Sequence, residues 1–218
     1  MNFRLNIAAV AALGMFAFAP AAQAQLINCD LNGTGDDYMG AAVFGGASSL
    51  WTELARFNSP SAAPLFNEAG ASTSVTVTYN RSNSGSLNPT GTYANLGTSG
   101  AKLSSPVTLD GLVAGDAYDL AIYSSVASSF TLSGDVETTS GTLDWSVLTQ
   151  GVNYALYHTV ADSAGKISFT GTSNNSSITF TAFQLQRGLP SAVPEPGSVA
   201  LLVGMTTIGA GLLRKRRK

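Results

Sequence analysis

Residues 74–79 read Ser-Val-Thr-Val-Thr-Tyr, and residues 117–124 read Ala-Tyr-Asp-Leu-Ala-Ile-Tyr-Ser. Alternate side chains in both stretches are apolar or aromatic, which is the period of a β-strand with one buried face. Runs rich in β-branched and aromatic residues predict further strands at 130–132, 143–148, 154–160, 167–172 and 178–185. No helical apolar stripe longer than about two turns occurs between 25 and 192, where 50–57 is the best short candidate. Many short strands without intervening helices predict an all-β fold, an antiparallel β-sandwich.

The segments between these strands contain turn sequences and two weakly patterned regions. Asn174 and Asn175 separate two predicted strands, so we expect a hairpin between residues 167 and 178. Residues 58–71 and 81–99 are rich in small and polar residues and are predicted to be long surface loops, where ligands often bind.

Composition excludes several classes of function. The 218 residues include one histidine and one cysteine, which excludes an intrachain disulfide and a zinc site built from histidine and cysteine ligands. Residues 25–192 carry twelve acidic and five basic side chains, a net charge of −7 that the whole-chain value of −2 conceals. Nucleic acid is therefore not an expected partner.

The N-terminus has the organisation of a secretory signal peptide. Arg4 precedes an apolar run over residues 7–19, and small residues follow at Ala22 and Ala24. The apolar run is shorter than the roughly 20 residues of a membrane span, so cleavage is favoured over an uncleaved anchor. We predict a signal peptide over 1–24, cleaved between Ala24 and Gln25.

The C-terminus contains three consecutive features. Val-Pro-Glu-Pro at 193–196 precedes an uncharged stretch over 197–213, which as a helix would extend about 25 Å and is predicted to span the inner membrane. The predicted cytoplasmic anchor comprises Arg214, Lys215, Arg216, Arg217 and Lys218. Such a basic cluster remains on the cytoplasmic side, so the residues upstream are expected outside the inner membrane.

This tail resembles the PEP-CTERM sorting signal of Gram-negative bacteria over residues 193–218. The resemblance implies that Pro194, Glu195 and Pro196 are recognised by exosortase, a membrane transpeptidase-like enzyme. It also implies export by the secretion machinery and sorting to the cell surface or the extracellular matrix. A proline-containing linker before a plain tail anchor is the alternative interpretation.

Residues 25–192 resemble a second group, the jelly-roll modules similar to galactose-binding-like sandwiches. The resemblance rests on short motifs at 27–31, at Trp51, and at 111–124, 151–154, 161–167 and 183–186. It implies a jelly-roll-like β-sandwich and carries no activity with it.

Residues that could support catalysis or metal binding are few. Oxygen-bearing side chains in residues 30–37 are compatible with a calcium loop, but the position of the EF-hand glutamate is Ala41, and an acidic turn is the favoured interpretation. His158 falls in a predicted strand as a packed or edge residue, and no G-x-S-x-G motif occurs. The paired carboxylates are Asp36 with Asp37 and Asp116 with Asp119. We predict no catalytic residue, no metal and no cofactor, and expect Cys29 to be a small buried hydrophobe.

Two tryptophans are candidates for stacking on sugar rings. Core packing is favoured for both, and most strongly for Trp145, which shares strand parity with Leu143 and Val147. Trp51 remains the candidate glycan-stacking residue. The sequence thus predicts a non-enzymatic surface or matrix protein with a structural or adhesive role. The alternatives are a carbohydrate-binding module attached to exopolysaccharide and a glycan-active hydrolase.

Overall fold

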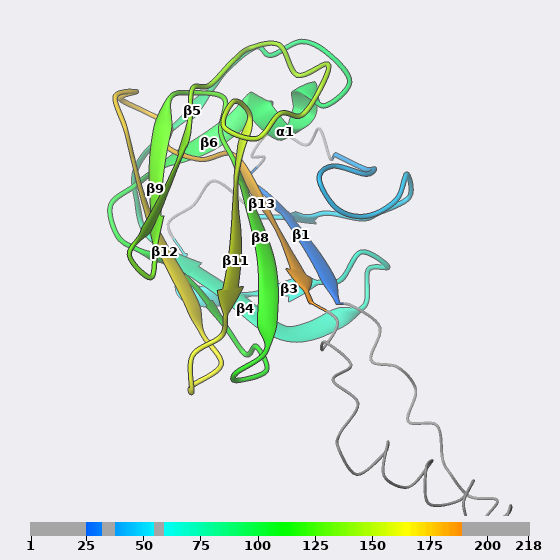
Figure 1. Ribbon diagram of the computed structural model, residues 1–218. Helices are drawn as coiled ribbons and strands as arrows, with labels where there is room; N and C mark the ends of the chain where they lie inside the picture. Colours follow the sequence, from blue (N-terminus) through cyan, green and yellow to red (C-terminus); the bar gives the residue numbers. More distant parts are fainter. Residues whose placement is uncertain (1–24, 32–37, 55–58, 189–218) are drawn as a thin grey trace, which may run out of the picture. The chain divides into compact units, whose positions relative to one another are not determined.

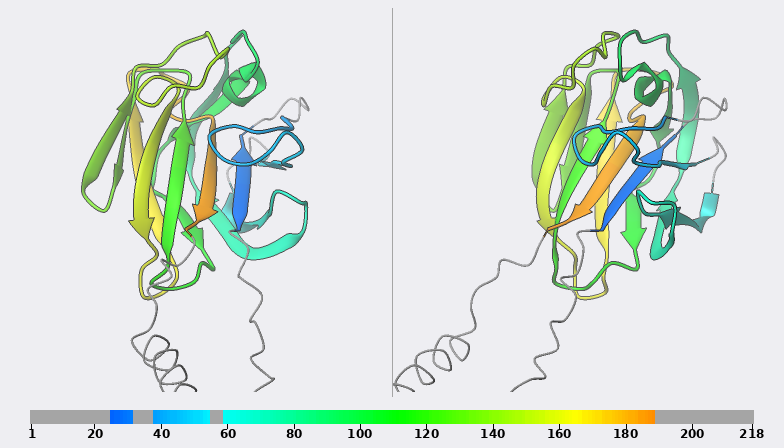
Figure 2. Two further views of the ribbon diagram at one scale, coloured as in Figure 1. Left: turned by 45° about the vertical axis from the view of Figure 1, so that its right-hand side comes forward. Right: turned by 90° about the vertical axis from the view of Figure 1, so that its right-hand side faces the viewer.

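The computed structural model describes residues 25–31, 38–54 and 59–188, which form two facing β-sheets (Figure 1, Figure 2). One sheet contains β1 (Leu26–Asp30), β2 (Thr52–Glu53), β8 (Ala117–Tyr123), β11 (Tyr154–Val160) and β13 (Ala182–Arg187), in the order β11-β8-β13-β1-β2. The other contains β3 (Ser59–Phe66), β4 (Ser72–Tyr79), β7 (Val107–Asp110), β9 (Ser128–Leu132), β10 (Asp135–Thr139) and β12 (Ile167–Ser173), in the order β10-β9-β12-β7-β4-β3. A small third sheet pairs β5 (Arg81–Ser86) with β6 (Ser99–Leu103), and α1 (Ala94–Thr98) precedes β6.

The predicted class is confirmed, because the described chain is β-rich and its sheets pair in antiparallel fashion as in a β-sandwich. The short parallel pairing of β1 with β2 is an exception. From β7 to β13 the chain passes repeatedly between the two sheets, with β9 and β10 joined as a hairpin in the six-stranded sheet. Ser133 and Gly134 both adopt positive φ in that hairpin's turn, at 52° and 95°, as a two-residue primed turn requires.

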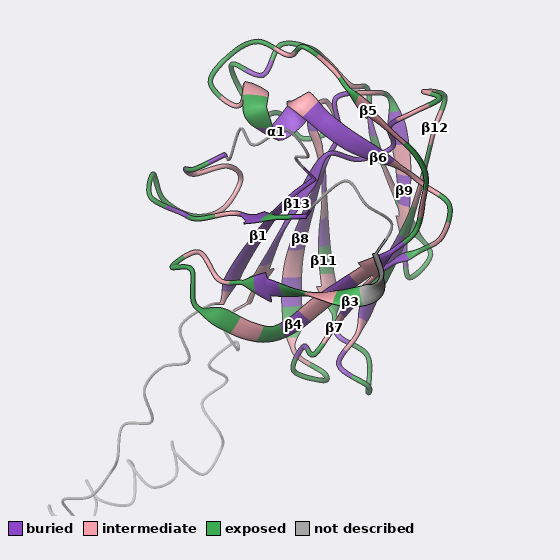
Figure 3. Ribbon diagram, turned by 180° about the vertical axis from the view of Figure 1, so that it is seen from behind, coloured by how far each residue is buried: buried purple, intermediate pink, exposed green. Residues whose placement is uncertain are grey.

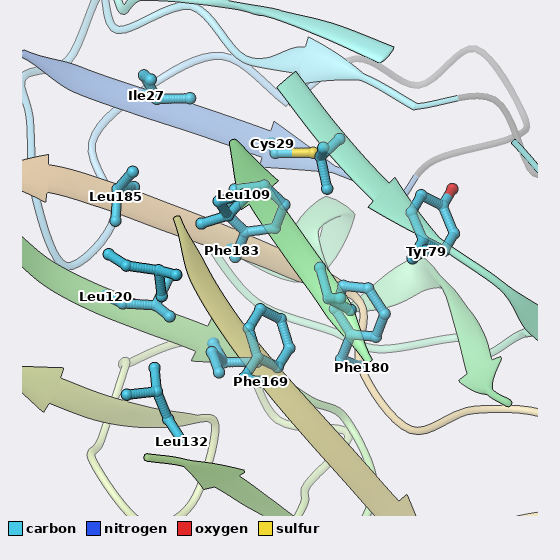
Figure 4. Packing of buried hydrophobic residues seen from close by; sticks show 14 of the residues in the cluster. Ile27, Cys29, Tyr79, Leu109, Leu120, Leu132, Phe169, Phe180, Phe183 and Leu185 are labelled. Atoms are coloured by element: carbon cyan, nitrogen blue, oxygen red, sulfur yellow. The ribbon is translucent and has the colours of Figure 1, made fainter. Parts of the chain in front are cut away.

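Apolar side chains at alternate strand positions form a continuous core between the sheets. Ile27 and Cys29 of β1 lie there with Leu120 of β8 and Leu185 of β13, and Figure 4 shows them facing side chains from β7 and β12. Phe169 of β12 forms an edge-to-face pair with Phe180, with ring centroids 6.0 Å apart. Cys29 is completely buried, as predicted, and burial raises the pKa of its thiol well above the ordinary value.

One side of the sandwich is closed by a tyrosine that reaches from one sheet to the other. Tyr157 of β11 donates a hydrogen bond to the Phe130 carbonyl oxygen at 2.7 Å and accepts one from the Glu137 amide at 3.0 Å. Phe130 and Glu137 belong to β9 and β10 of the opposite sheet. The phenol therefore satisfies two backbone groups of the six-stranded sheet, while its ring, carried by the five-stranded sheet, contributes to the core.

Several expectations for individual segments are wrong. The proposed hairpin over 167–178 does not form, because β12 and β13 lie in opposite sheets and the intervening chain crosses between them. Residues 143–148 form a loop rather than a strand, and the proposed loops 58–71 and 81–99 contain β3, β5 and α1. The short helix expected at 50–57 is replaced by β2 in its described part, because Thr52 and Glu53 pair with β1. Here tertiary pairing overrides local composition.

The first and last described residues lie at the same end of the five-stranded sheet. Leu26 pairs with Gln186, and the Arg187 amide donates a hydrogen bond to the Gln25 carbonyl oxygen at 3.0 Å. The predicted signal peptide and the whole predicted sorting signal lie outside the described residues. Within the part that is described, no helix is both long and apolar enough to cross a membrane.

Candidate functional site: an aromatic pocket on the outer face

The five-stranded sheet is buried on both faces at one end, which is unusual for an antiparallel sheet. Figure 3 shows that β1 is buried throughout and that most of β13 and β8 is buried as well. On the outer face, a second cluster forms around Tyr123 of β8 and Trp145 of the loop between β10 and β11. Its other members are Tyr38, Leu96, Ala121 and Ala182, with Ala42, Val43, Phe44, Trp51, Tyr93, Leu148, Tyr154 and Leu156 packed against it. We call this set the outer cluster.

A buried hydrogen-bond network attaches loop 38–50 to the sheet. The Gln184 Oε1 atom accepts hydrogen bonds from the Phe44 amide at 3.0 Å and the Tyr123 hydroxyl at 2.5 Å. Gln184 Nε2 donates to Asn28 Oδ1 at 2.7 Å and to the Phe44 carbonyl oxygen at 3.0 Å. Asn28 in turn donates to the Leu50 carbonyl oxygen at 2.9 Å. Because Gln184 and Asn28 are fully buried, this network fixes the loop in a single position.

Two other loops, residues 87–93 and 140–153, are hydrogen-bonded to each other over the same end of the sheet. Backbone hydrogen bonds join Thr90 to Leu143 and to Trp145, and Tyr93 donates to the Trp145 carbonyl oxygen at 2.9 Å. The Trp145 indole is fully buried and donates its N–H to the Thr142 carbonyl oxygen at 2.9 Å. A Cβ atom on Gly97 would lie 2.6 Å from the Trp145 ring, so only glycine allows α1 to approach this closely.

A pocket of about 290 Å³ opens where the three loops meet. It is lined by Ala42, Val43, Tyr93, Ser146, Val147, Leu148 and Tyr154. None of these side chains is charged, and the half-buried rings of Tyr93 and Tyr154 belong to segments far apart in the sequence. Behind them, Tyr38 packs against Tyr93 with ring centroids 6.4 Å apart, and burial followed by the neighbouring Tyr93 raises the pKa of Tyr38 to about 12. The pocket therefore presents uncharged walls that combine aromatic rings, aliphatic side chains and polar groups.

The two tryptophans singled out from the sequence both belong to the outer cluster. Trp145 is buried as predicted, but the parity argument is wrong, since Leu143 and Val147 are 51% and 70% exposed in a loop. Trp51 is half-buried, with its ring 5.3 Å from that of Tyr38, edge to face, and 6.2 Å from that of Tyr123. Its indole N–H donates to the Gly40 carbonyl oxygen at 3.1 Å, so that donor already serves the loop.

Among the described residues, the candidate acids and bases are not gathered into one site. His158 lies at an exposed position of the edge strand β11, as predicted, with its Nδ1 2.5 Å from Asp119 Oδ1. Asp116 instead contacts Arg187, whose Nε donates to its carboxylate at 2.6 Å. Asp36 and Asp37 lie outside the described residues.

The calcium alternative concerns residues 30–37, of which 32–37 are not described. The side chain of Asp30 is buried at the end of β1. Among the described residues, no group of three or more histidine, cysteine, aspartate or glutamate side chains is placed to hold a metal ion.

Sequence reasoning missed Tyr93 and Tyr154. Tyr154, Leu156 and His158 share one face of β11, and the first two could have indicated that this outer face is covered at one end. Tyr93 lies in a Gly- and Ser-rich segment, where no local pattern marks it.

Comparison with known proteins gives little further information. No protein-family model matches the chain, and no curated protein matches its sequence. The X-ray structure of the YxiM protein from Bacillus subtilis superposes with a TM-score of 0.41 at 7% identity, over 76% of this chain and 40% of that one. A calcium-binding mutant of β-glucuronidase 2 from Bacteroides uniformis gives 0.40 at 13% identity, over 70% and 22%. The chain spans less than half of either protein, and likenesses of this degree carry no argument about function.

Proposed function

We propose that this chain is an exported protein, sorted to the cell surface or extracellular matrix, whose β-sandwich has a non-catalytic structural or adhesive role. The observation that carries the proposal is the pairing of Gln25 with Arg187 at one end of the sheet. In the sequence, the predicted cleavage site immediately precedes Gln25, and the predicted sorting signal begins five residues after Gly188. A folded sandwich with this connectivity can be tethered through its C-terminus without any rearrangement of its strands.

The finer assignments belong to the same proposal. The passage of consecutive strands between the two sheets supports a jelly-roll-like topology. Pro194, Glu195 and Pro196 would bind exosortase, since two prolines favour an extended segment suited to an enzyme groove. Residues 197–213 would span the inner membrane, with the basic residues 214–218 in the cytoplasm.

Export and sorting are tested by expressing a tagged chain in a bacterium that contains exosortase. We expect the exported form to begin at Gln25, and the protein to reach the surface or the matrix. Changing Pro194, Glu195 and Pro196 to alanine should stop sorting and leave the protein in the inner membrane. Glu137→Gln, a matched change of one carboxylate within the sandwich, should leave sorting intact. Tagged protein found in the cytosol with residues 1–24 attached would overturn the proposal.

Carbohydrate binding is the second candidate function, and the uncharged pocket between Tyr93 and Tyr154 favours it. The hydrolase alternative lacks comparable support, because the pairs formed by His158 with Asp119 and by Arg187 with Asp116 lie at the opposite end of the sheet from this pocket.

A further inference from the structure

The aromatic pocket has walls that are fixed before any ligand arrives. Loop 38–50, which contributes Ala42 and Val43, is attached by the buried amide of Gln184. The loop that contributes Ser146 and Leu148 is attached through Trp145 and its backbone bonds to Thr90. A preformed site loses less conformational entropy on binding than one that must be ordered by its ligand.

The lining selects the chemical class of the ligand. Tyrosine rings pack against the C–H faces of pyranose rings, and their hydroxyl groups can exchange hydrogen bonds with sugar hydroxyls. The Ser146 hydroxyl adds a further polar group at the wall. Small-molecule sites typically combine apolar and aromatic walls with a few polar groups of this kind.

Charge around the pocket favours a neutral ligand. Asp144 lies two residues before Ser146 and accepts a hydrogen bond from the Ser146 amide at 3.0 Å. Hydrogen bonds from Ser146 lower the pKa of Asp144, so its carboxylate is negative at neutral pH. No lining side chain is basic, so an anionic ligand such as a uronate polymer would find no counter-charge in the wall.

A second cavity of similar volume is less suited to binding. It is lined by Ala127, Ser128, Ser129, Thr138, Thr139, Thr172, Ser173 and Asn174. Three of its hydroxyl groups already donate to backbone carbonyls, Ser128 to Thr179, Thr139 to Val126, and Ser173 to Ile178. It also lacks an aromatic ring, so it offers no surface on which a sugar ring could stack.

The pocket lies at the end of the sheet remote from the chain termini. Tyr154 pairs with Tyr123, whereas Val160 at the other end of β11 pairs with Ala117, close to Arg187. Six residues of strand separate the two ends, which corresponds to about 20 Å. In a chain tethered after Gly188, the pocket therefore lies at the end of the sheet remote from that residue.

We propose that this pocket binds a neutral, pyranose-containing polysaccharide, with the rings of Tyr93 and Tyr154 contacting the sugar. The inference rests on the proposed function, because it gives the adhesive role of the surface protein a site and a class of ligand. It replaces Trp51 with Tyr93 and Tyr154 as the principal aromatic contacts.

The test is a calorimetric titration of the mature exported chain. The neutral probes are hexasaccharides built from glucose, mannose, galactose or xylose. An oligogalacturonate of the same length is the acidic probe. We expect at least one neutral hexasaccharide to bind, and the acidic probe to bind at least tenfold more weakly than that one. Tyr93→Ala or Tyr154→Ala should weaken neutral binding by about tenfold or more, whereas the corresponding phenylalanine variants, which keep the ring, should change it by less than about threefold.

The alanine variants could lose binding because they unfold, so a second variant changes an exposed residue of the pocket instead. Val147 lines the pocket and is 70% exposed, so Val147→Asp should abolish binding while leaving the melting temperature almost unchanged. Val136→Asp, at a 58% exposed position of β10, is the matched control and should bind as the unmodified chain does.

Failure to bind any neutral hexasaccharide, or binding that survives Val147→Asp, would overturn the inference. Preferential binding of the acidic probe would also overturn it. These results would leave the proposed function standing if the protein still reached the surface, because sorting depends on the C-terminal signal and not on the pocket. Retention in the cytosol would instead remove the proposed function, whatever the pocket binds.

Discussion

The core between the sheets and the outer cluster bury similar aromatic residues but are held together in different ways. The inner core is formed by side chains that alternate along strands, and Phe169 and Phe183 fill it without polar partners. The outer cluster depends on loops, on the amide of Gln184, and on indole and phenol groups that donate hydrogen bonds. Apolar burial is the main stabilising term in the first, with hydrogen bonds of Tyr157 at one side, whereas the second needs each of its polar groups to be paired.

This difference has a functional meaning. A core made by strand alternation leaves no room for a ligand, because both sheets interdigitate at high density. The outer cluster is built from loops that meet imperfectly, and the pocket lies at their junction. Hydrogen bonds position those loops, so the pocket has a defined shape and stays open.

The largest expected effect comes from truncating the inner core. Phe169→Ala should lower the free energy of unfolding by about 3–5 kcal/mol, since Phe169 is 1% exposed and contacts the rings of Phe130 and Phe180. Urea denaturation of the variant provides the measurement. Val136→Ala, at an exposed position, should change the same quantity by less than about 0.5 kcal/mol. Equal losses for the two variants would contradict the assigned core.

A smaller but more localised effect is expected from Gln184→Leu in the outer cluster. The change leaves the Phe44 amide and the buried Asn28 Oδ1 atom without their partner, which should cost about 2–4 kcal/mol. Limited proteolysis should then cut loop 38–50 faster than in the unmodified chain. Gln186→Leu, two residues further along β13 and half-buried, is the control and should leave the cleavage rate unchanged. Unchanged cleavage in Gln184→Leu would show that the amide does not hold the loop.

Gly97→Ala tests the contact between α1 and Trp145. The added methyl group would lie within 2.6 Å of the indole ring and 2.5 Å of Ser125 Oγ, so α1 must shift. We expect a loss of about 1–3 kcal/mol and a change in tryptophan fluorescence. Gly46→Ala, where an added Cβ meets nothing within 4 Å, should change neither the free energy of unfolding nor the fluorescence. A Gly97→Ala protein with unaltered fluorescence would refute the close packing.

The smallest effect compares one tyrosine from each region at alkaline pH. Burial raises the pKa of Tyr79 in the inner core and of Tyr38 in the outer cluster from 10.0 to about 12. Their contribution to stability is complete below pH 10, because both phenols are then neutral, and is lost as the pH rises towards 12 and only the unfolded chain ionises. Urea denaturation at pH 8, 10 and 12 should show this loss. Tyr79→Phe and Tyr38→Phe should each flatten it, and a pH dependence identical in both variants and the unmodified chain would contradict the assignment.

The sequence predicted the inner core well and the outer cluster poorly. Val75, Val77 and Tyr79 alternate as expected and are buried, because a strand with one covered face imposes a two-residue period. No such period governs loop residues, so Trp145 was placed inside by an argument from strand parity that its exposed neighbours refute. Tyr93 could not be located, because its position depends on backbone pairing between residues 90 and 144.

The segments where local composition failed share a physical cause. Residues 59–66 contain small residues and two prolines, which are unfavourable in a central strand but acceptable at the sheet edge that β3 occupies. The Asn174-Asn175 turn was identified, but a turn does not determine whether the next strand stays in the same sheet. Only long-range pairing of β13 with β1 and β8 decides this.

The position of β13 also determines how the molecule would bear mechanical load. This strand is hydrogen-bonded along both edges, to β1 and to β8, and it ends at the side from which the proposed tether leaves. A pull between a polymer held at the far end and that tether would act along the strand axis. The backbone hydrogen bonds on both edges of β13 would then be loaded in shear. They would have to break together and not one after another. In the proposed surface protein, this arrangement would keep the sandwich folded while it remains attached.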